Sequence, residues 1–215
     1  MRIHISAENF CKKIPMRNLL FALLVTAFLT VVGRVEAQIQ IAVGDAKVDG
    51  FEVEVQQTPS FSADGVKGKN IPNPRDWLEL EVEFEVKGPK DVVIPELLFR
   101  YYVGFKDQAG QARTLTGDVT HTNVLFNETY FSAAYVAPSK LGELTGDFRK
   151  FQKSSMSAYG VEIYYNGVIV GGFSSLSGSS AKFWTVTGTE AGVQAKGDTP
   201  FALLWIDRYA ESKKR

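Results

Sequence analysis

The feature that most constrains the fold is a ten-residue stretch in which apolar and acidic residues alternate without a break. The stretch reads WLELEVEFEV and runs from Trp77 to Val86. Side chains along a β-strand point alternately to its two faces, so one face of this segment is apolar and the other is acidic. The acidic residues, called the glutamate ladder below, are Glu79, Glu81, Glu83 and Glu85. The pattern predicts a strand with one face in a core.

The same period-two pattern recurs along most of the chain. The candidate strands are IQIAV, FEVEV, WLELEVEFEV, ELLFRYYVGF, TLTGDVTHT, TYFSAAYV, GVEIYYN, GVIVGGF, KFWTVT and FALLWI. Asn166-Gly167, between two of them, predicts a type I′ hairpin because both residues tolerate positive φ. Strands without regularly alternating helices favour an all-β chain, and we expect a two-layer antiparallel immunoglobulin-like β-sandwich rather than a closed barrel.

One segment breaks the period-two pattern. In PSKLGELTGDFRKFQ, apolar residues recur at spacings of three and four, and Ser139 could cap a helix start. The apolar residues are Leu141, Leu144, Phe148 and Phe151. We expect a short helix that plugs an open end of the sandwich, with a docking element as the alternative.

The amino terminus has the organisation of a secretory signal peptide. A fourteen-residue apolar run, Leu19–Val32, follows Arg17 and precedes the tripeptide that ends at Ala37. The run is shorter than the ~18 residues expected of a membrane-spanning helix. Cleavage after Ala37 would start the mature chain at Gln38. An uncleaved anchor helix is the alternative.

We therefore divide the chain into a signal peptide, residues 1–37, and a single sandwich domain, residues 38–215. Counted from Met1 the leader exceeds the usual ~15–30 residues, whereas a start at Met16 would bring it within that range. Its removal leaves 19 basic and 22 acidic residues, a net charge of −3, which disfavours nucleic acid as a partner. Cys11, the only cysteine, leaves with the leader, so stability must come from the core.

The mature chain lacks the residues of common catalytic and metal sites. It keeps one histidine, His121, and no cysteine, so a His/Cys metal site cannot form within one chain. It also lacks a nucleophile elbow, a phosphate-binding loop, a dinucleotide fingerprint and an EF-hand loop. We expect a structural His121, no cofactor, no metal and no enzymatic activity. A pair of carboxylates in a cleft, as in glycoside hydrolases, is the remaining enzyme alternative.

The glutamate ladder could face water, a cation or a partner. Residues two apart on a strand lie about 6.6 Å apart, too far to share one calcium ion without help from a neighbour. Glu52 and Glu54 repeat the pattern, and because directly opposed like charges destabilise a sheet, the two acidic strands should not pair in register. We expect a solvated, edge-protecting face with basic side chains beside it, and Arg100 is the candidate.

Adjacent aromatic residues supply the last candidates. Tyr101-Tyr102, Tyr130-Phe131 and Tyr164-Tyr165 lie in predicted strands, so one ring of each pair must point away from the core. Such rings lie flat on the sheet, stack on sugars or form protein interfaces. The predicted interaction surface therefore comprises the glutamate ladder, Arg100 and Tyr102. Carbohydrate binding through exposed aromatic rings is the alternative function.

Several segments together with the leader resemble a known group of proteins. The segments are FEVEVQQTPSF, WLELEVEFEV, LLFRYYVGF, VTHTNV and AAYVAPSKL. They are similar to small exported immunoglobulin-like proteins encoded beside type IV pilus-like machinery in mucin-dwelling Verrucomicrobia. The resemblance implies the sandwich fold, export to the periplasm, outer-membrane surface or exterior, and a pilus or surface-adhesion role; it implies no site residue.

One departure from pilins refines that implication. A type IV pilin keeps its apolar segment as an assembly helix, whereas the predicted cut at Ala37 removes it and leaves no membrane span. The resemblance then implies an accessory or surface subunit. Its expected partners are further copies of the chain or other pilus and cell-envelope proteins.

Overall fold

The structure is a computed structural model that describes residues 39–62 and 64–213. The predicted signal peptide and the cleavage position between Ala37 and Gln38 lie outside the described residues. The described chain from Gln40 onward forms one compact unit. Within it, no helix combines the length and the apolar character needed to cross a membrane.

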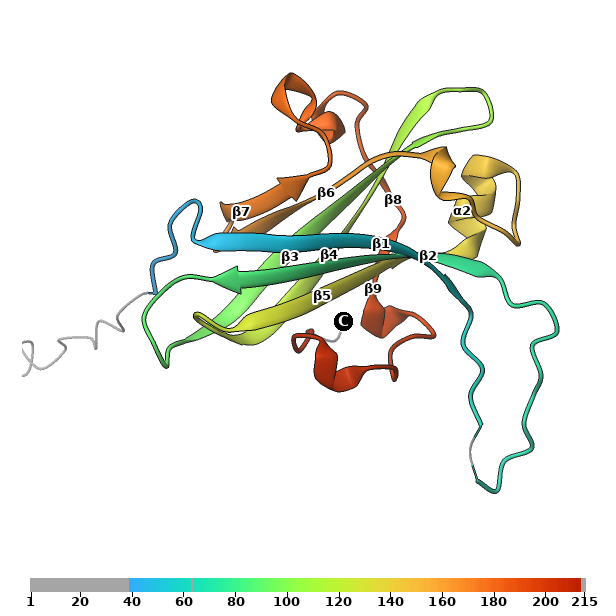
Figure 1. The fold of residues 1–215 in the computed structure, drawn as a ribbon, viewed down its shortest axis with the longest axis horizontal. Helices are drawn as coiled ribbons and strands as arrows, with labels where there is room; N and C mark the ends of the chain where they lie inside the picture. The colour runs from blue at the N-terminus through green and yellow to red at the C-terminus, as the bar shows by residue number, and fades with distance from the viewer. Residues whose placement is uncertain (1–38, 63, 214–215) are drawn as a thin grey trace, which may run out of the picture. The chain divides into compact units, whose positions relative to one another are not determined.

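Strands make up most of the described chain. They are β1 (Ala46–Gln57), β2 (Asp76–Val86), β3 (Val93–Lys106), β4 (Ala112–Leu125), β5 (Thr129–Val136), β6 (Met156–Tyr165), β7 (Val168–Ser174), β8 (Glu190–Ala191) and β9 (Val193–Ala195). Their hydrogen-bonded order is β8-β4-β3-β6-β7-β1-β2-β5-β9. This sheet folds over on itself, so that β1, β2 and β5 lie across from β3, β4 and β6 (Figure 1). The predicted all-β, sandwich-like fold is confirmed.

The apolar face of β2 forms one wall of the core between the layers. Its residues Leu78, Leu80, Val82, Phe84 and Val86 have no exposed surface. Alternate residues of β3 form the opposite wall, and the rings of Phe84 and Phe99 meet with their centroids 4.6 Å apart. Full burial of such a side chain stabilises by about 1.5–3 kcal/mol. The strand predicted from the alternating pattern is confirmed.

The two layers are joined along both long edges, by different means. On one edge, β1 and β7 pair in parallel through Ala46 and Gly171 alone. A Cβ on Gly171 would lie 2.0 Å from the carbonyl oxygen of Ala46, so this close approach requires glycine. On the other edge, β8 pairs with β4 and β9 with β5, and isolated bridges at Ser212 and Tyr209 continue the connection. The C-terminal segment thus closes the second edge.

A buried chain of hydrogen bonds reinforces the second edge. The Tyr101 hydroxyl donates to Ser132 Oγ at 2.6 Å, and Ser132 Oγ lies 2.6 Å from His121 Nε2. His121 Nδ1 is 3.2 Å from the carbonyl oxygen of Ala210, so Nδ1 carries the proton and Nε2 accepts from Ser132. Burial lowers the pKa of His121 to about 4, so the ring is neutral at pH 7. The predicted structural histidine is confirmed.

The hairpin between β6 and β7 is also confirmed. Asn166 and Gly167 have φ values of 48° and 80°, as the two central residues of a type I′ turn require. Because glycine and asparagine adopt positive φ at low cost, this short-range signal was readable without knowledge of the partner strands.

The predicted helix forms as α2 (Pro138–Thr145), with different details. Its N-cap is Ala137, not Ser139, and Gly146 ends it with φ 82° in the left-handed conformation. Leu141 and Leu144 are buried as expected, whereas Phe148 is 54% exposed because the helix has ended before it. The contacts of α2 are with β2 and β3 at the end of the sandwich, which agrees with the predicted plug.

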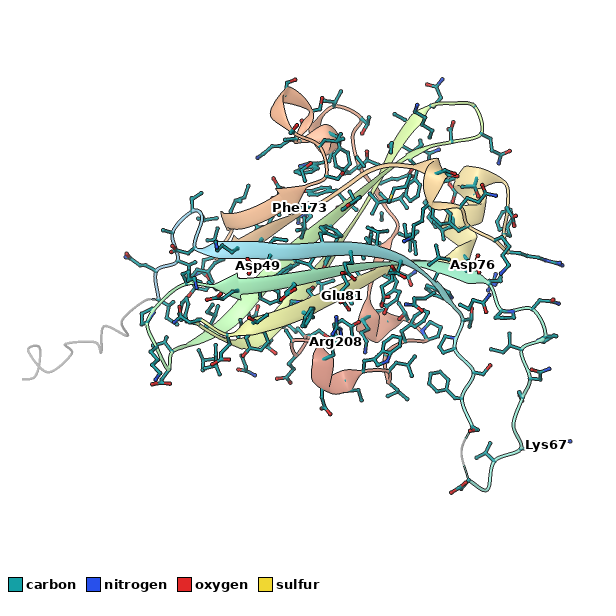
Figure 2. All side chains as sticks on the ribbon, viewed as in Figure 1. Asp49, Lys67, Asp76, Glu81, Phe173 and Arg208 are labelled. Atoms are coloured by element: carbon teal, nitrogen blue, oxygen red, sulfur yellow. The ribbon has the colours of Figure 1, made fainter. Side chains whose placement is uncertain are left out.

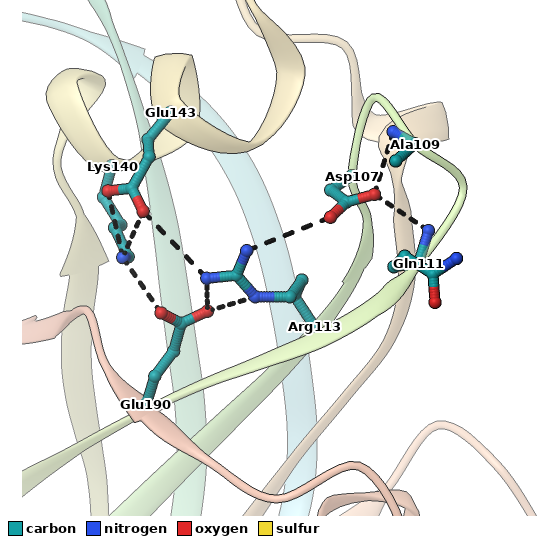
Figure 3. A network of polar contacts seen from close by, with 7 residues as sticks. All are labelled: Asp107, Ala109, Gln111, Arg113, Lys140, Glu143 and Glu190. Carbon is teal, nitrogen blue, oxygen red and sulfur yellow. Dashed lines mark hydrogen bonds and ion pairs between the residues drawn. The ribbon is translucent and has the colours of Figure 1, made fainter.

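A cluster of charged residues holds α2 at that end (Figure 3). Arg113 Nε lies 2.8 Å from Glu190 Oε1, and Lys140 Nζ lies 3.1 Å from Glu190 Oε2. Lys140 also pairs with Glu143 at 3.0 Å on the next turn of the helix. The cluster thereby connects β4, β8 and α2, which are distant in the sequence.

Three of the predicted strands are wrong. IQIAV at 39–43 forms no strand, KFWTVT at 182–187 contains the 3-10 helix η3 (Phe183–Thr185), and FALLWI at 201–206 forms turns that lead into η5 (Ile206–Arg208). The second and third segments lie against the outer faces of the layers, each through one buried ring, Trp184 in the second and Phe201 in the third. We call residues 182–187 the first strap and residues 199–209 the second strap.

Candidate functional site

The two acidic strands pair in register, contrary to the prediction. In the β1–β2 ladder, Glu52 lies opposite Glu81, and Glu54 lies opposite Glu79. Directly opposed like charges are destabilising unless other groups compensate. The compensation comes from side chains of the second strap, of β5 and of β1 itself, so the acidic face is only partly solvated.

Glu79 lies at the covered end of the ladder. Glu79 is only 5% exposed. One carboxylate oxygen accepts a hydrogen bond from the Tyr135 hydroxyl, and the other accepts one from Gln56 Nε2 at 2.9 Å. Charge-assisted hydrogen bonds of this kind are what make a buried carboxylate tolerable. The predicted solvated role is wrong for Glu79.

Glu81 is held by the second strap. The Arg208 guanidinium donates to both carboxylate oxygens, and the Tyr209 hydroxyl donates to Oε2 at 2.6 Å. Figure 2 shows Glu81 on β2 with Arg208 on the strap beside it. Burial disfavours the charged carboxylate, but the hydrogen bonds from Arg208 and Tyr209 outweigh it and hold the pKa of Glu81 below its usual value.

The other end of the ladder is open. Glu83 lies opposite Gly50 rather than opposite another acid, and within the described chain it has no hydrogen bond or ion pair. Glu85 pairs with Lys87 two residues along the chain. Both residues keep part of their surface exposed, so the predicted solvated role applies to them in part. The predicted edge protection is wrong, because β2 pairs with β1 on one side and with β5 on the other and is not an edge strand.

Aromatic stacking fixes the second strap on the outer face of β2 and β5. The Phe201 ring stacks on Tyr135 with centroids 4.5 Å apart and planes within 5°, and it meets Trp77 edge-on at 5.7 Å. The Arg208 guanidinium lies 3.9 Å from the centre of the Phe131 ring. A small apolar cluster therefore forms outside the main core.

Between β1 and the second strap lies a pocket of about 420 Å³. It is lined by Glu52, Glu54, Gln56, Glu79, Glu81, Trp205, Arg208 and Tyr209. Four carboxylates face one lining cation, so the pocket carries an excess of negative charge, and we call it the acidic groove. Among the described residues no group of three or more side chains is arranged to hold a metal ion.

Exposed apolar side chains lie on the part of the second strap that includes Trp205, which lines the acidic groove. Leu203 is 72% exposed, Trp205 is 50% exposed and Ile206 is 62% exposed. Trp205 has φ 50°, a left-handed conformation that non-glycine residues seldom adopt and that often marks functional positions. We call these three residues the apolar ridge.

Arg100 and Tyr102 lie on the other layer, so the prediction that Arg100 lies beside the glutamate ladder is wrong. Arg100 binds Asp118 through two hydrogen bonds of 2.8 Å. The Tyr102 hydroxyl donates to Glu162 at 2.8 Å, and Trp184 of the first strap stacks on the Tyr102 ring with centroids 4.3 Å apart and planes within 3°. The structure thus divides the predicted interaction surface between two separate sites.

A second pocket, of about 450 Å³, surrounds Arg100. It is lined by Arg100, Tyr102, Thr116, Gly117, Asp118, Trp184, Thr189 and Ala191. Its one cation and one carboxylate are already paired with each other, and Trp184 already covers the tyrosine ring. The acidic groove is therefore the site with unbalanced charge.

The tyrosine pairs do not form an open platform. Both members of Tyr101-Tyr102 are buried, and those of Tyr130-Phe131 and Tyr164-Tyr165 are partly covered. Trp205 and Arg208, which do lie at the groove, were not predicted as site residues. The segment FALLWIDRY did carry a signal, because its apolar residues precede a basic and an aromatic residue that can reach an acidic strand.

Comparisons with known proteins agree with this fold. A crystal structure of a protein from Akkermansia muciniphila superposes with a TM-score of 0.70 and 25% sequence identity, covering 83% of this chain and 96% of that one. The source fits the resemblance to proteins of Verrucomicrobia. No curated protein matches the chain. A protein-family model matches residues 37–215, which include the whole sequence after the predicted leader, and the chain therefore belongs to the family that this model describes.

Proposed function

We propose that the protein is an exported, non-enzymatic interaction protein of the cell envelope, an accessory pilus or surface subunit that associates with further copies of itself. The observation that carries this proposal is the apolar ridge beside the acidic groove. Three large apolar side chains within four residues are exposed, and clustered exposed apolar residues mark protein interaction sites.

The state of the groove carboxylates supports a binding role over catalysis. A glycosidase needs one carboxylic acid with a raised pKa to protonate the leaving group. The pKa of Glu81 is instead held below its usual value by Arg208 and Tyr209, and Glu79 is already engaged by Tyr135 and Gln56. These two carboxylates suit a fixed negative surface better than proton transfer.

Export and surface location rest on the predicted signal peptide and on the resemblance to exported proteins of Verrucomicrobia. The apolar run Leu19–Val32 and the Ala37 cleavage position favour secretion. The matched protein comes from Akkermansia muciniphila, a Verrucomicrobium, as the resemblance implies. Within this proposal, association with a pilus is the more specific claim, and it comes from the resemblance alone.

The proposal is tested on the exported protein, purified from cells that secrete it. Intact mass is expected to give an amino terminus at Gln38, and light scattering coupled to gel filtration is expected to give a mass above that of one chain, rising with concentration. A retained leader would contradict export. A strict monomer that binds mucin-type glycans would reverse the proposal in favour of a carbohydrate-binding module.

A pair of variants locates the surface. Replacing the apolar ridge by serine (L203S/W205S/I206S) is expected to lower self-association while leaving the fold intact, because all three side chains are exposed. Val186→Ser is the matched control, since Val186 is 83% exposed on the first strap. Equal loss in both variants would contradict a role specific to the ridge.

A further inference from the structure

The connection between β1 and β2 is far longer than a hairpin needs. The ladder ends at Gln57 opposite Asp76, and eighteen residues, 58–75, join the two strands. Antiparallel neighbours usually need only about two to five, and loops beyond about 12–15 residues are usually functional or disordered. The Thr58 amide donates to the Arg75 carbonyl at 3.0 Å and closes the base. We call residues 58–75, of which the structure describes all but residue 63, the arm.

The arm extends away from the strands into solvent. Figure 1 shows it leaving the ends of β1 and β2, and Figure 2 places Lys67 near its far end. Every described residue between Ser60 and Asn70 is exposed. The arm therefore contributes almost nothing to the core of its own chain.

The arm combines positive charge with exposed apolar side chains. Lys67 and Lys69 make no ion pair with any described residue. Asp64 is the one acid between residues 58 and 75, against two lysines and Arg75. Phe61 is 50% exposed and Val66 is 69% exposed.

The acidic groove has the complementary character. Glu52 has no hydrogen bond or ion pair within the described chain, and Glu54 has only an exposed contact of 3.7 Å with Lys153. Both carboxylates lie opposite other glutamates, an arrangement that costs stability and that a cationic occupant would relieve. Trp205 of the apolar ridge lines the same groove, and the exposed ridge offers a surface for apolar side chains.

We propose that the arm of one copy docks in the acidic groove of the next. Lys67 and Lys69 would pair with Glu52 and Glu54, and the arm's apolar side chains would pack on the ridge. This inference rests on the proposed self-association and specifies its geometry. Because arm and groove are different surfaces, the contact is heterologous and propagates as an open filament or closes as a ring.

A charge-swap experiment on the exported protein tests this geometry. The arm variant K67E/K69E and the groove variant E52K/E54K are each expected to lower the self-association constant by about tenfold or more, since opposed like charges then meet at the contact. An equimolar mixture of the two variants is expected to associate again, because the acidic arm of one fits the basic groove of the other. Sedimentation velocity at low and high salt measures all three samples.

Two controls make the result specific. The variant K90E/K106E lowers the net charge by the same amount as K67E/K69E, at two other exposed lysines that lack ion pairs within the described chain, and it is expected to associate like wild type. Far-ultraviolet circular dichroism checks that every variant keeps its β structure.

The possible outcomes distinguish the arm-and-groove contact from self-association in general. Wild-type association in both charge-swap variants would overturn the arm-and-groove contact and leave self-association through another surface. A mixture that stays monomeric while each variant is monomeric would also overturn the contact. A wild-type protein that is monomeric at every concentration would overturn both.

Discussion

The outer faces of the two layers both carry aromatic rings, charged side chains and a covering strap, but they differ in how many of the charges are paired. On the β3–β6 face, Arg100 is paired with Asp118, and Trp184 of the first strap lies flat on Tyr102. On the β1–β2 face, the second strap stacks on Tyr135 but leaves a groove in which four carboxylates face one arginine. Both faces contain aromatic rings and charges, so their composition does not distinguish them. What distinguishes them is how completely the charged side chains on each face are paired.

The largest expected effect comes from removing the anchor of the second strap. Phe201→Ala deletes a ring that is 1% exposed and that contacts Tyr135 and Trp77. We expect it to lower the free energy of unfolding by about 3–5 kcal/mol. Val186→Ala on the first strap, at an exposed position, should change stability by no more than about 0.5 kcal/mol. Urea unfolding measures both; a loss below about 1 kcal/mol for Phe201→Ala would show that the strap is not held by this ring.

The next effect is a pH dependence at the edge that the C-terminal segment closes. Burial lowers the pKa of His121 to about 4 in the folded state, against about 6.5 when unfolded. The unfolded chain therefore takes up a proton first as the pH falls, so stability is fully present above pH 6.5 and is lost toward pH 4. The loss should reach about 3 kcal/mol.

The variant His121→Gln isolates this contribution. It is expected to be less stable than wild type at pH 7, with a stability difference that shrinks as the pH falls from 6.5 to 4. Urea unfolding at several pH values measures it. A difference that stays constant across this range would show that His121 is not kept neutral by burial.

Arg208 and Arg100 should contribute differently to stability, because their carboxylate partners are buried to different extents. Arg208→Ala removes the cation from Glu81, whose side chain is 13% exposed, and should cost about 1–2 kcal/mol. Arg100→Ala breaks a pair whose side chains are 39% and 37% exposed and should cost at most about 1 kcal/mol. Removing Arg208 should also raise the pKa of Glu81, which carbon-detected NMR titration can follow. The reverse order of costs would contradict the difference between the faces.

The smallest expected effect has the opposite sign. Glu52→Gln removes a like-charge opposition with Glu81 and should stabilise the fold by about 0.2–1 kcal/mol, less at high salt. Glu83→Gln is the control, because Glu83 lies opposite Gly50 and should give no such gain. Thermal unfolding at two salt concentrations compares them. A destabilised Glu52→Gln would mean that this carboxylate serves the fold rather than a partner.

The sequence by itself determined the features that depend on neighbours along the chain. Alternation placed Leu78 and Phe84 in the core, positive-φ residues placed the turn at Asn166, and spacing placed Leu141 on the buried side of α2. In each case the signal and its consequence lie within a few residues, so periodicity and turn chemistry are sufficient.

Only the tertiary structure decided what covers each outer face. Arg208 forms an ion pair with Glu81 although the two residues are 127 positions apart, whereas Arg100, the sequence-based candidate, lies on the other layer. The register that opposes Glu52 to Glu81 likewise depends on how two strands meet across an eighteen-residue arm. An apolar strap and an apolar strand have similar composition, so KFWTVT and FALLWI were read as strands. Their true role follows from long-range packing and charge compensation, which no local pattern records.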